Sequence, residues 1–120
     1  MSTGKWSDEW TRLRKALGYS LSGLRMAVGQ PAFRIELLVG LPMLLLALWL
    51  PLSGVSRALL IGSVFLVWIA ELLNSSVEAA IDRIGAEIHP LSKQAKDIAS
   101  AAVLLALLNA GLVWACVLWG

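Results

Sequence analysis

Three stretches of mostly apolar residues follow a polar and charged start of this chain of 120 residues. A helix needs about 20 mostly apolar residues to cross the hydrocarbon core of a bilayer. The first stretch is short and contains a glycine and a proline, and the tight turn Pro51–Gly54 separates it from the second. The pattern predicts an all-α integral membrane protein of one domain, with transmembrane helices at about 34–52, 55–82 and 97–119.

The polar start, at about 6–30, carries apolar residues at steps of three and four while its basic residues occupy other faces. The apolar positions are Trp6, Trp10, Leu13, Leu17, Leu21, Leu24 and Val28. This pattern is typical of a basic amphipathic helix that lies in the headgroup plane. Ser7 is the expected N-cap, and Gly18 and Gly23 are expected to loosen the helix. The helix is either a surface anchor or a lid over a site at the membrane face.

The charges give the membrane protein an orientation. The chain is 58% hydrophobic, with a net charge of +2. Of the ten basic residues, only Arg57 lies near the turn between the first two apolar stretches. The positive-inside rule therefore predicts a cytoplasmic N-terminus and second loop, with the C-terminus outside. The single cysteine, Cys116, excludes an intrachain disulfide, and the lone His89 gives no pattern of zinc ligands.

The third apolar stretch carries a small-residue stripe, Ala102, Ala106 and Ala110. Small residues at this spacing allow helices to approach closely in lipid. Asn109 lies beside the stripe. We interpret its side chain as one that makes a hydrogen bond between helices rather than one that binds a ligand. Three short helices bury little surface alone, so a homo-oligomer is expected.

Two carboxylates, Glu71 and Glu78, stand inside the second apolar stretch, where no charge occurs from Ala58 to Ala70. At about 100° per residue, both share one helix face with Asn74, Ser75 and Asp82. An ionisable group at the depth of Glu71 costs about 3 kcal/mol or more, so it indicates a functional site. The alternative is a carboxylate that merely bonds to a neighbouring helix.

The loop Asp82–Asp97 adds further charged residues beside this face. Carboxylates that bind a divalent cation, next to a lysine for phosphate oxygens, are what phosphoryl transfer requires. Magnesium usually takes one or two protein carboxylates, a role that suits Glu78 at the membrane boundary. Glu71, deeper in the membrane, suits a general base for a hydroxyl group. The geometry predicts a lipid alcohol arriving from the membrane and a nucleotide arriving from water.

The run Ala70–Val103 resembles the signature of the small prokaryotic diacylglycerol kinases, as do Lys15–Arg25 and Ala32–Glu36. The resemblance covers nearly the whole chain. It implies a homotrimer in the bacterial cytoplasmic membrane, each subunit with a surface helix and three transmembrane helices. The implied reaction transfers the γ-phosphate of ATP, with Mg²⁺ as cofactor, to diacylglycerol and gives phosphatidic acid. No nucleic-acid partner is expected.

The resemblance also implies roles for individual residues. Glu71 is implied as the catalytic base, Asn74 and Lys96 as its catalytic partners and Glu78 as a magnesium ligand. The implied nucleotide contacts are Arg12, Tyr19, Gln30, Glu78, Glu87, Ile88, His89, Lys96 and Asp97. The implied lipid-site residues are Ala16, Leu17, Gly18, Tyr19, Ser20, Leu21, Arg25, Met26, Ala27, Val28, Ala32, Phe33, Arg34, Ile35, Glu36, Glu71, Ser100, Trp114 and Trp119.

One position departs from the family pattern. Before the Ala32-Phe33-Arg34 triplet the pattern carries a second metal-binding glutamate, and the aligned residue here is Gln30. An amide can ligate magnesium through its carbonyl oxygen but supplies no charge.

Two further readings stay open beside the diacylglycerol kinase. One keeps the fold and changes the substrate to a polyprenol such as undecaprenol. The other is a non-enzymatic membrane subunit whose polar face binds a partner helix. Lys96, Asp97 and the loop 87–89 argue against the non-enzymatic subunit, because a packing face has no need of groups that face a nucleotide.

Overall fold

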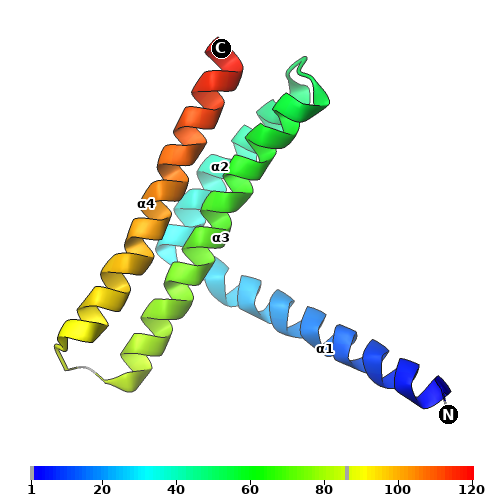
Figure 1. The fold of residues 1–120 in the computed structure, drawn as a ribbon, viewed down its shortest axis with the longest axis vertical. Helices are drawn as coiled ribbons and strands as arrows, with labels where there is room; N and C mark the ends of the chain where they lie inside the picture. Colours follow the sequence, from blue (N-terminus) through cyan, green and yellow to red (C-terminus); the bar gives the residue numbers. More distant parts are fainter. Residues whose placement is uncertain (1, 86) are drawn as a thin grey trace.

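The computed structural model describes residues 2–85 and 87–120, and this part of the chain forms four helices without a strand (Figure 1). They are α1 (Ser2–Val28), α2 (Pro31–Trp49), α3 (Gly54–Ile84) and α4 (Pro90–Trp119). By length and composition, α2, α3 and α4 can each cross a membrane. The predicted all-α fold with three membrane spans is confirmed.

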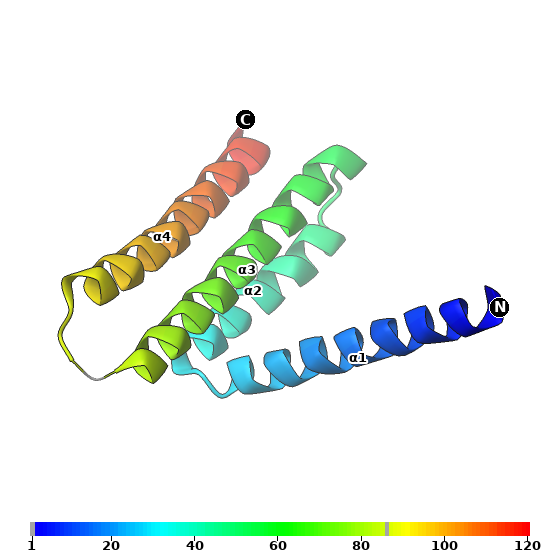
Figure 2. The same cartoon turned by 60° about the horizontal axis from the view of Figure 1, so that its bottom comes forward.

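Helix α3 is the centre of the bundle and packs against both α2 and α4. Helix α1 leaves the base of the bundle at a wide angle and projects away from it (Figures 1 and 2). Nearly all of α1 is exposed, and Ala27 near its C-terminal end is its only buried residue among those described. The direction of such a helix depends more on the surroundings of the chain than on contacts with the bundle.

Two details of α1 differ from the sequence prediction. The helix runs without a break through Gly18 and Gly23, because one glycine costs a long helix only about 1 kcal/mol. It also begins at Ser2, so Ser7 lies inside the helix and is not its N-cap. The Ser7 hydroxyl instead donates a hydrogen bond to the carbonyl oxygen of Gly4, at 2.8 Å.

The turn between α2 and α3 is held by side chains. Ser53 caps α3, its Oγ accepting a hydrogen bond from the Ser56 N–H at 3.2 Å. Arg57 Nε donates to the Ala47 carbonyl oxygen at 3.1 Å, and its Nη2 donates to that of Leu50 at 2.9 Å. These carbonyls belong to the last turn of α2 and the residue after it, so Arg57 satisfies groups that the helix leaves open.

The core lies along one face of α3. Leu60 and Val64 pack with Ala47 of α2 and Trp114 of α4. One turn further along, the second cluster brings α3 against α4; its buried members are Val67, Ala70, Val103 and Ala106. Trp114 Nε1 donates to Ser63 Oγ at 3.1 Å, which fixes the indole between the two helices.

The small-residue stripe of α4 is only partly confirmed. Ala106 is buried against α3 and Ala110 is half-buried beside it, but Ala102 is exposed. Asn109 is exposed too, and no hydrogen bond joins its side chain to another helix within the described residues. Its expected bond between helices therefore has no partner inside this chain.

Helices α3 and α4 both extend beyond the predicted spans at the ends that face the loop between them. Helix α4 begins at Pro90 rather than near residue 97, and α3 ends at Ile84. The added turns are polar, and the first of them in α4 carry the ion pair between Lys93 and Asp97 one turn apart. Lys96, which reaches the candidate site, lies in the polar turns of α4.

Candidate active site

The packed face of α3 becomes polar toward its C-terminal end. The spacing that buries Leu60, Val64 and Val67 continues, at steps of three and four residues, with the polar residues. These are Glu71, Asn74, Glu78 and Asp82. The packing that holds α3 between α2 and α4 therefore also orients the candidate catalytic side chains.

Glu71 is 7% exposed and is the only buried charged residue in the described part of the chain. Within those residues its side chain makes no hydrogen bond. Its carboxyl oxygens are not among the fully buried atoms without a partner, so they keep some exposure and can meet another molecule. The position suits a group that acts on a substrate.

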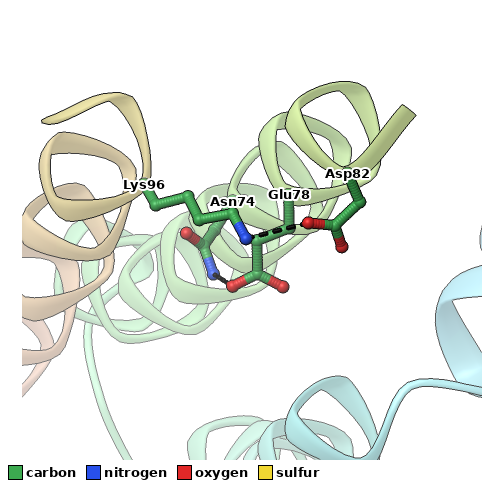
Figure 3. Close-up of polar contacts among 4 residues, drawn as sticks. All are labelled: Asn74, Glu78, Asp82 and Lys96. Atoms are coloured by element: carbon green, nitrogen blue, oxygen red, sulfur yellow. Dashed lines mark hydrogen bonds and ion pairs between the residues drawn. The ribbon is translucent and has the colours of Figure 1, made fainter. Parts of the chain in front are cut away.

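Asn74 lies between Glu71 and the exposed end of the same face. Its Nδ2 donates a hydrogen bond to Glu78 Oε1 at 3.2 Å (Figure 3). Its Oδ1 is buried and has no partner among the described residues. Buried polar atoms without partners are rare in proteins, and a bound substrate or ion is one explanation for such an atom.

Lys96 reaches across from α4 to the same face. Its Nζ donates to Asp82 Oδ1 at 2.8 Å (Figure 3). This hydrogen bond, and then the charge of Asp82, raise the pKa of Lys96 above its ordinary value of 10.5. Because Lys96 lies in the polar turns before the apolar part of α4, its ammonium group stays charged and within reach of water.

The loop between α3 and α4 contributes an exposed group of residues. Glu87 and His89 are exposed, Ile88 is fully exposed, and a cavity of about 500 Å³ lies beside Glu87 and His89. His89 also has a role that sequence reasoning missed, because its Nδ1 caps α4 by accepting from the Leu91 N–H at 3.1 Å. Its place directly before Pro90, the first residue of α4, was the signal.

Gln30 sits at the corner between α1 and α2. It lines a cavity of about 620 Å³ between α1 and α3, together with Ser20, Ala27 and Ser75. Ser75 lies at the edge of the polar face, so this cavity adjoins the candidate site. No hydrogen bond joins Gln30 to Glu78 within the described chain. The metal pair predicted from the family pattern stays a prediction.

The N-terminal half of α1 lies apart from the C-terminal half of α3 in both views (Figures 1 and 2). Arg12 and Tyr19 are exposed on this helix, Tyr19 by 74%. Among the described residues no hydrogen bond joins Arg12 or Tyr19 to Glu78 or Lys96, and the N-terminal half of α1 does not cover the site as a lid.

The predicted lipid-site residues divide into three groups. Those on α1 are mostly exposed, with the exception of Ala27. Glu36 and Trp114 line an apolar cavity of about 230 Å³ between α2, α3 and α4. Phe33 is buried, whereas Ser100 and Trp119 are exposed. Only the pair from α2 and α4 thus shares a cavity, and Glu71 is not part of its lining.

The described residues contain no group of three or more acidic, histidine or cysteine side chains arranged to hold a metal ion. Magnesium does not require such a cage, because it keeps water and binds phosphate oxygens. The Glu78 carboxylate and the unpartnered Oδ1 of Asn74 are suitable oxygen donors. The site fits a magnesium ion that arrives with a nucleotide.

The sequence was then compared with known proteins. The family model described as prokaryotic diacylglycerol kinase matches residues 18–118. The chain belongs to this family. It is 50% identical to the diacylglycerol kinase of Escherichia coli (strain K12) over 111 residues, which are 92% of this chain and 91% of that protein.

Two further relatives carry the same name. The diacylglycerol kinase of Pseudomonas aeruginosa is 44% identical over 110 residues, 91% of this chain and 89% of that protein. That of Helicobacter pylori (strain 26695) is 45% identical over 104 residues, 86% and 81% of the two chains. The resemblance read from the sequence is confirmed. The family match begins at residue 18, so Arg12, Ala16 and Leu17 lie outside it.

Proposed function

We propose that this protein is a diacylglycerol kinase that transfers the γ-phosphate of ATP to the free hydroxyl group of diacylglycerol. The observation that carries the proposal is the continuous polar face of α3, which leads from the buried Glu71 to the exposed Glu78 and Asp82. A lipid hydroxyl group can reach the buried end and a nucleotide the exposed end. The named relatives support this choice of substrate and donor.

Glu71 acts as the general base in this reaction. It accepts the proton of the hydroxyl group while the hydroxyl oxygen attacks the γ-phosphorus atom. The bond between that atom and the bridging oxygen of the β-phosphate breaks, which gives phosphatidic acid and ADP. Positioning and electrostatic stabilisation supply most of the catalysis in such transfers.

Glu78 and Asn74 would hold the magnesium ion that accompanies ATP, and that ion would neutralise charge on the phosphates. Lys96 supplies positive charge at the same end of the site, where Asp82 holds its ammonium group. Asp97, Glu87, Ile88 and His89 extend the nucleotide site along the loop and the first turns of α4. Arg12, Tyr19 and Gln30 join the site if α1 moves toward the polar face.

The protein is proposed to work as a homotrimer in the cytoplasmic membrane, with its N-terminus in the cytoplasm. The charge distribution supports the orientation, because nine of the ten basic residues then face the cytoplasm. The large apolar surface of α2 and α4 is available for subunits as well as for lipid. The orientation also places Glu78 and Lys96 where ATP is found.

The test is a phosphorylation assay on the purified full chain in mixed micelles with labelled ATP. Diacylglycerol and undecaprenol are offered side by side, with the Glu71→Gln variant as the control for the assigned site. Label transferred to diacylglycerol by the wild type, and lost in the variant, is the expected result. Transfer to undecaprenol alone would change the substrate, and transfer to neither lipid would overturn the kinase assignment.

A further inference from the structure

The indole of Trp68 joins α3 to α2 over a single turn of α2. Its Nε1 donates a hydrogen bond to the main-chain carbonyl oxygen of Glu36 at 2.9 Å. A Cβ atom added at Gly40 would lie 2.7 Å from Cζ2 and 2.8 Å from Nε1 of this indole. The ring therefore rests against the bare backbone at Gly40, a close approach that only glycine permits.

A second aromatic ring contacts the Trp68 indole. Phe65, on the preceding turn of α3, meets it in a T-shaped arrangement, with ring centroids 5.4 Å apart and an angle of 76° between the rings. Such edge-to-face pairs are favourable and restrict the orientation of both rings. With Gly40, the Glu36 carbonyl and Phe65 as neighbours, the indole has one well-defined position.

This position matters because Glu71 lies one helical turn after Trp68. Glu71 makes no hydrogen bond within the described residues, so packing alone fixes its position. Glu36 is the acidic residue of α2 whose charge acts on it. Glu36, Gly40 and Trp68 also line the cavity of about 230 Å³ that extends from this point into the apolar bundle. The contact between Trp68 and α2 thus lies between the two carboxyl groups and the apolar interior.

Resting on the proposed kinase function, we infer that Trp68 is a positioning residue for phosphoryl transfer. Its hydrogen bond to the Glu36 carbonyl oxygen and its close contact with Gly40 fix the position of α2 relative to α3 beside Glu71. This placement decides where the base meets the lipid hydroxyl group. Catalysis is sensitive to such placement, since an error of about 1 Å can lower the rate by about 10²-fold.

Arg57 provides a matched comparison, because it joins the same two helices at their other end. It donates to the carbonyl oxygens of Ala47 and Leu50. Fourteen residues of helix separate it from Glu71, which corresponds to roughly 20 Å. Arg57 holds α2 to α3 without lying near the site. Its replacement therefore measures what such a contact contributes to the stability of the bundle alone.

The first experiment compares wild type, Trp68→Phe and Arg57→Gln in the micelle assay. Phenylalanine keeps an aromatic ring but lacks the N–H group. Trp68→Phe is expected to lower kcat by about tenfold or more, with KM for ATP unchanged. Arg57→Gln is expected to lower the midpoint of thermal unfolding and to keep the wild-type kcat. A wild-type kcat in Trp68→Phe would overturn the inference, as would equal losses of kcat in both variants.

A double-mutant cycle tests the close contact with Gly40. Gly40→Ala should lower kcat in the wild-type background, because the added Cβ displaces the indole. In the Trp68→Leu background the same change should cost less, since the ring that the Cβ would meet is gone. Additive losses would contradict the inference. If Gly40→Ala does not fold, recovery of folding in the double variant tests the same contact. A wild type that phosphorylates no lipid would instead refute the kinase function.

Discussion

In the first half of α3, Leu60 and Val64 are buried against Ala47 of α2 and Trp114 of α4. In the second half the same face carries Glu71, which is buried, and continues into exposed acidic residues. Both halves belong to the same helix and the same face of that helix. The chemistry of the side chains differs.

The two halves also differ in how their polar groups are satisfied. In the first half, Ser63 accepts from Trp114 and donates to the Leu60 carbonyl oxygen at 2.7 Å. In the second half, Oδ1 of Asn74 is buried without a partner among the described residues, and Glu71 has no hydrogen bond there. Satisfied groups hold a structure, whereas open ones remain available to a ligand. The first half, with its polar groups satisfied, therefore holds the helix in place, and we call it the satisfied half. The second half, with its polar groups open, carries the proposed site, and we call it the open half.

The largest expected effect comes from the open half. Glu71→Gln should lower kcat by about 10²–10⁴, the usual contribution of a general base. Folding should be preserved, because glutamine has nearly the same shape and its amide is easier to bury than a charge. Steady-state kinetics and the unfolding midpoint of the same preparation measure both. Retention of more than about a tenth of the wild-type kcat would contradict the role of Glu71.

Lys96→Met is the next largest change in the open half. If Lys96 steadies the γ-phosphate, kcat should fall by about 10²–10³, as when one group that stabilises transition-state charge is removed. The unfolding midpoint should hardly change, because both Lys96 and its partner Asp82 are substantially exposed. Near-normal kinetics with unchanged dependence on ATP and magnesium would show that Lys96 is only an interfacial anchor.

The satisfied half should respond in the opposite way. Ser63→Ala removes the acceptor of the Trp114 N–H and leaves that group buried without a partner. The expected cost is about 1 kcal/mol of stability, because a hydrogen bond between helices makes only a modest net contribution to the stability of a membrane protein. Unfolding in detergent measures this cost, and kcat of the folded protein should equal that of the wild type. A large loss of kcat would show that the two halves do not divide the work in this way.

The sequence predicted the fold and the polar face because both rest on periodicity within one helix. Glu71, Asn74 and Glu78 share a face at any packing angle. The direction of α1 could not be predicted, since it depends on contacts between helices and with the membrane. The bond between Trp68 and Glu36 joins residues 32 positions apart, and no local pattern announces it. The cap at His89 was predictable from its place before Pro90, but the charges of the loop indicated nucleotide contacts alone.

The smallest expected effect concerns Gln30, which lies beside the open half without belonging to it. Its side chain forms no cap on α2, and it shares a cavity with Ser75 at the edge of the polar face. A carboxylate here would add one negative charge near the proposed magnesium ion. At about 8 Å, in water, one negative charge attracts the doubly charged ion by about 1 kcal/mol, which corresponds to about fivefold in affinity. Gln30→Glu should therefore lower the half-saturating magnesium concentration by up to about this factor.

Gln30→Ala is the matched control, because it removes the amide oxygen and adds no charge. If Gln30 ligates magnesium, the alanine variant should require more of the ion than the wild type, and the glutamate variant less. A magnesium titration of kcat at constant ATP separates the three proteins. One shared half-saturating concentration would place Gln30 outside the metal shell. A different residue of the segment, with Glu36 as the first candidate, would then supply the second ligand, and α1 would have no need to move for metal binding.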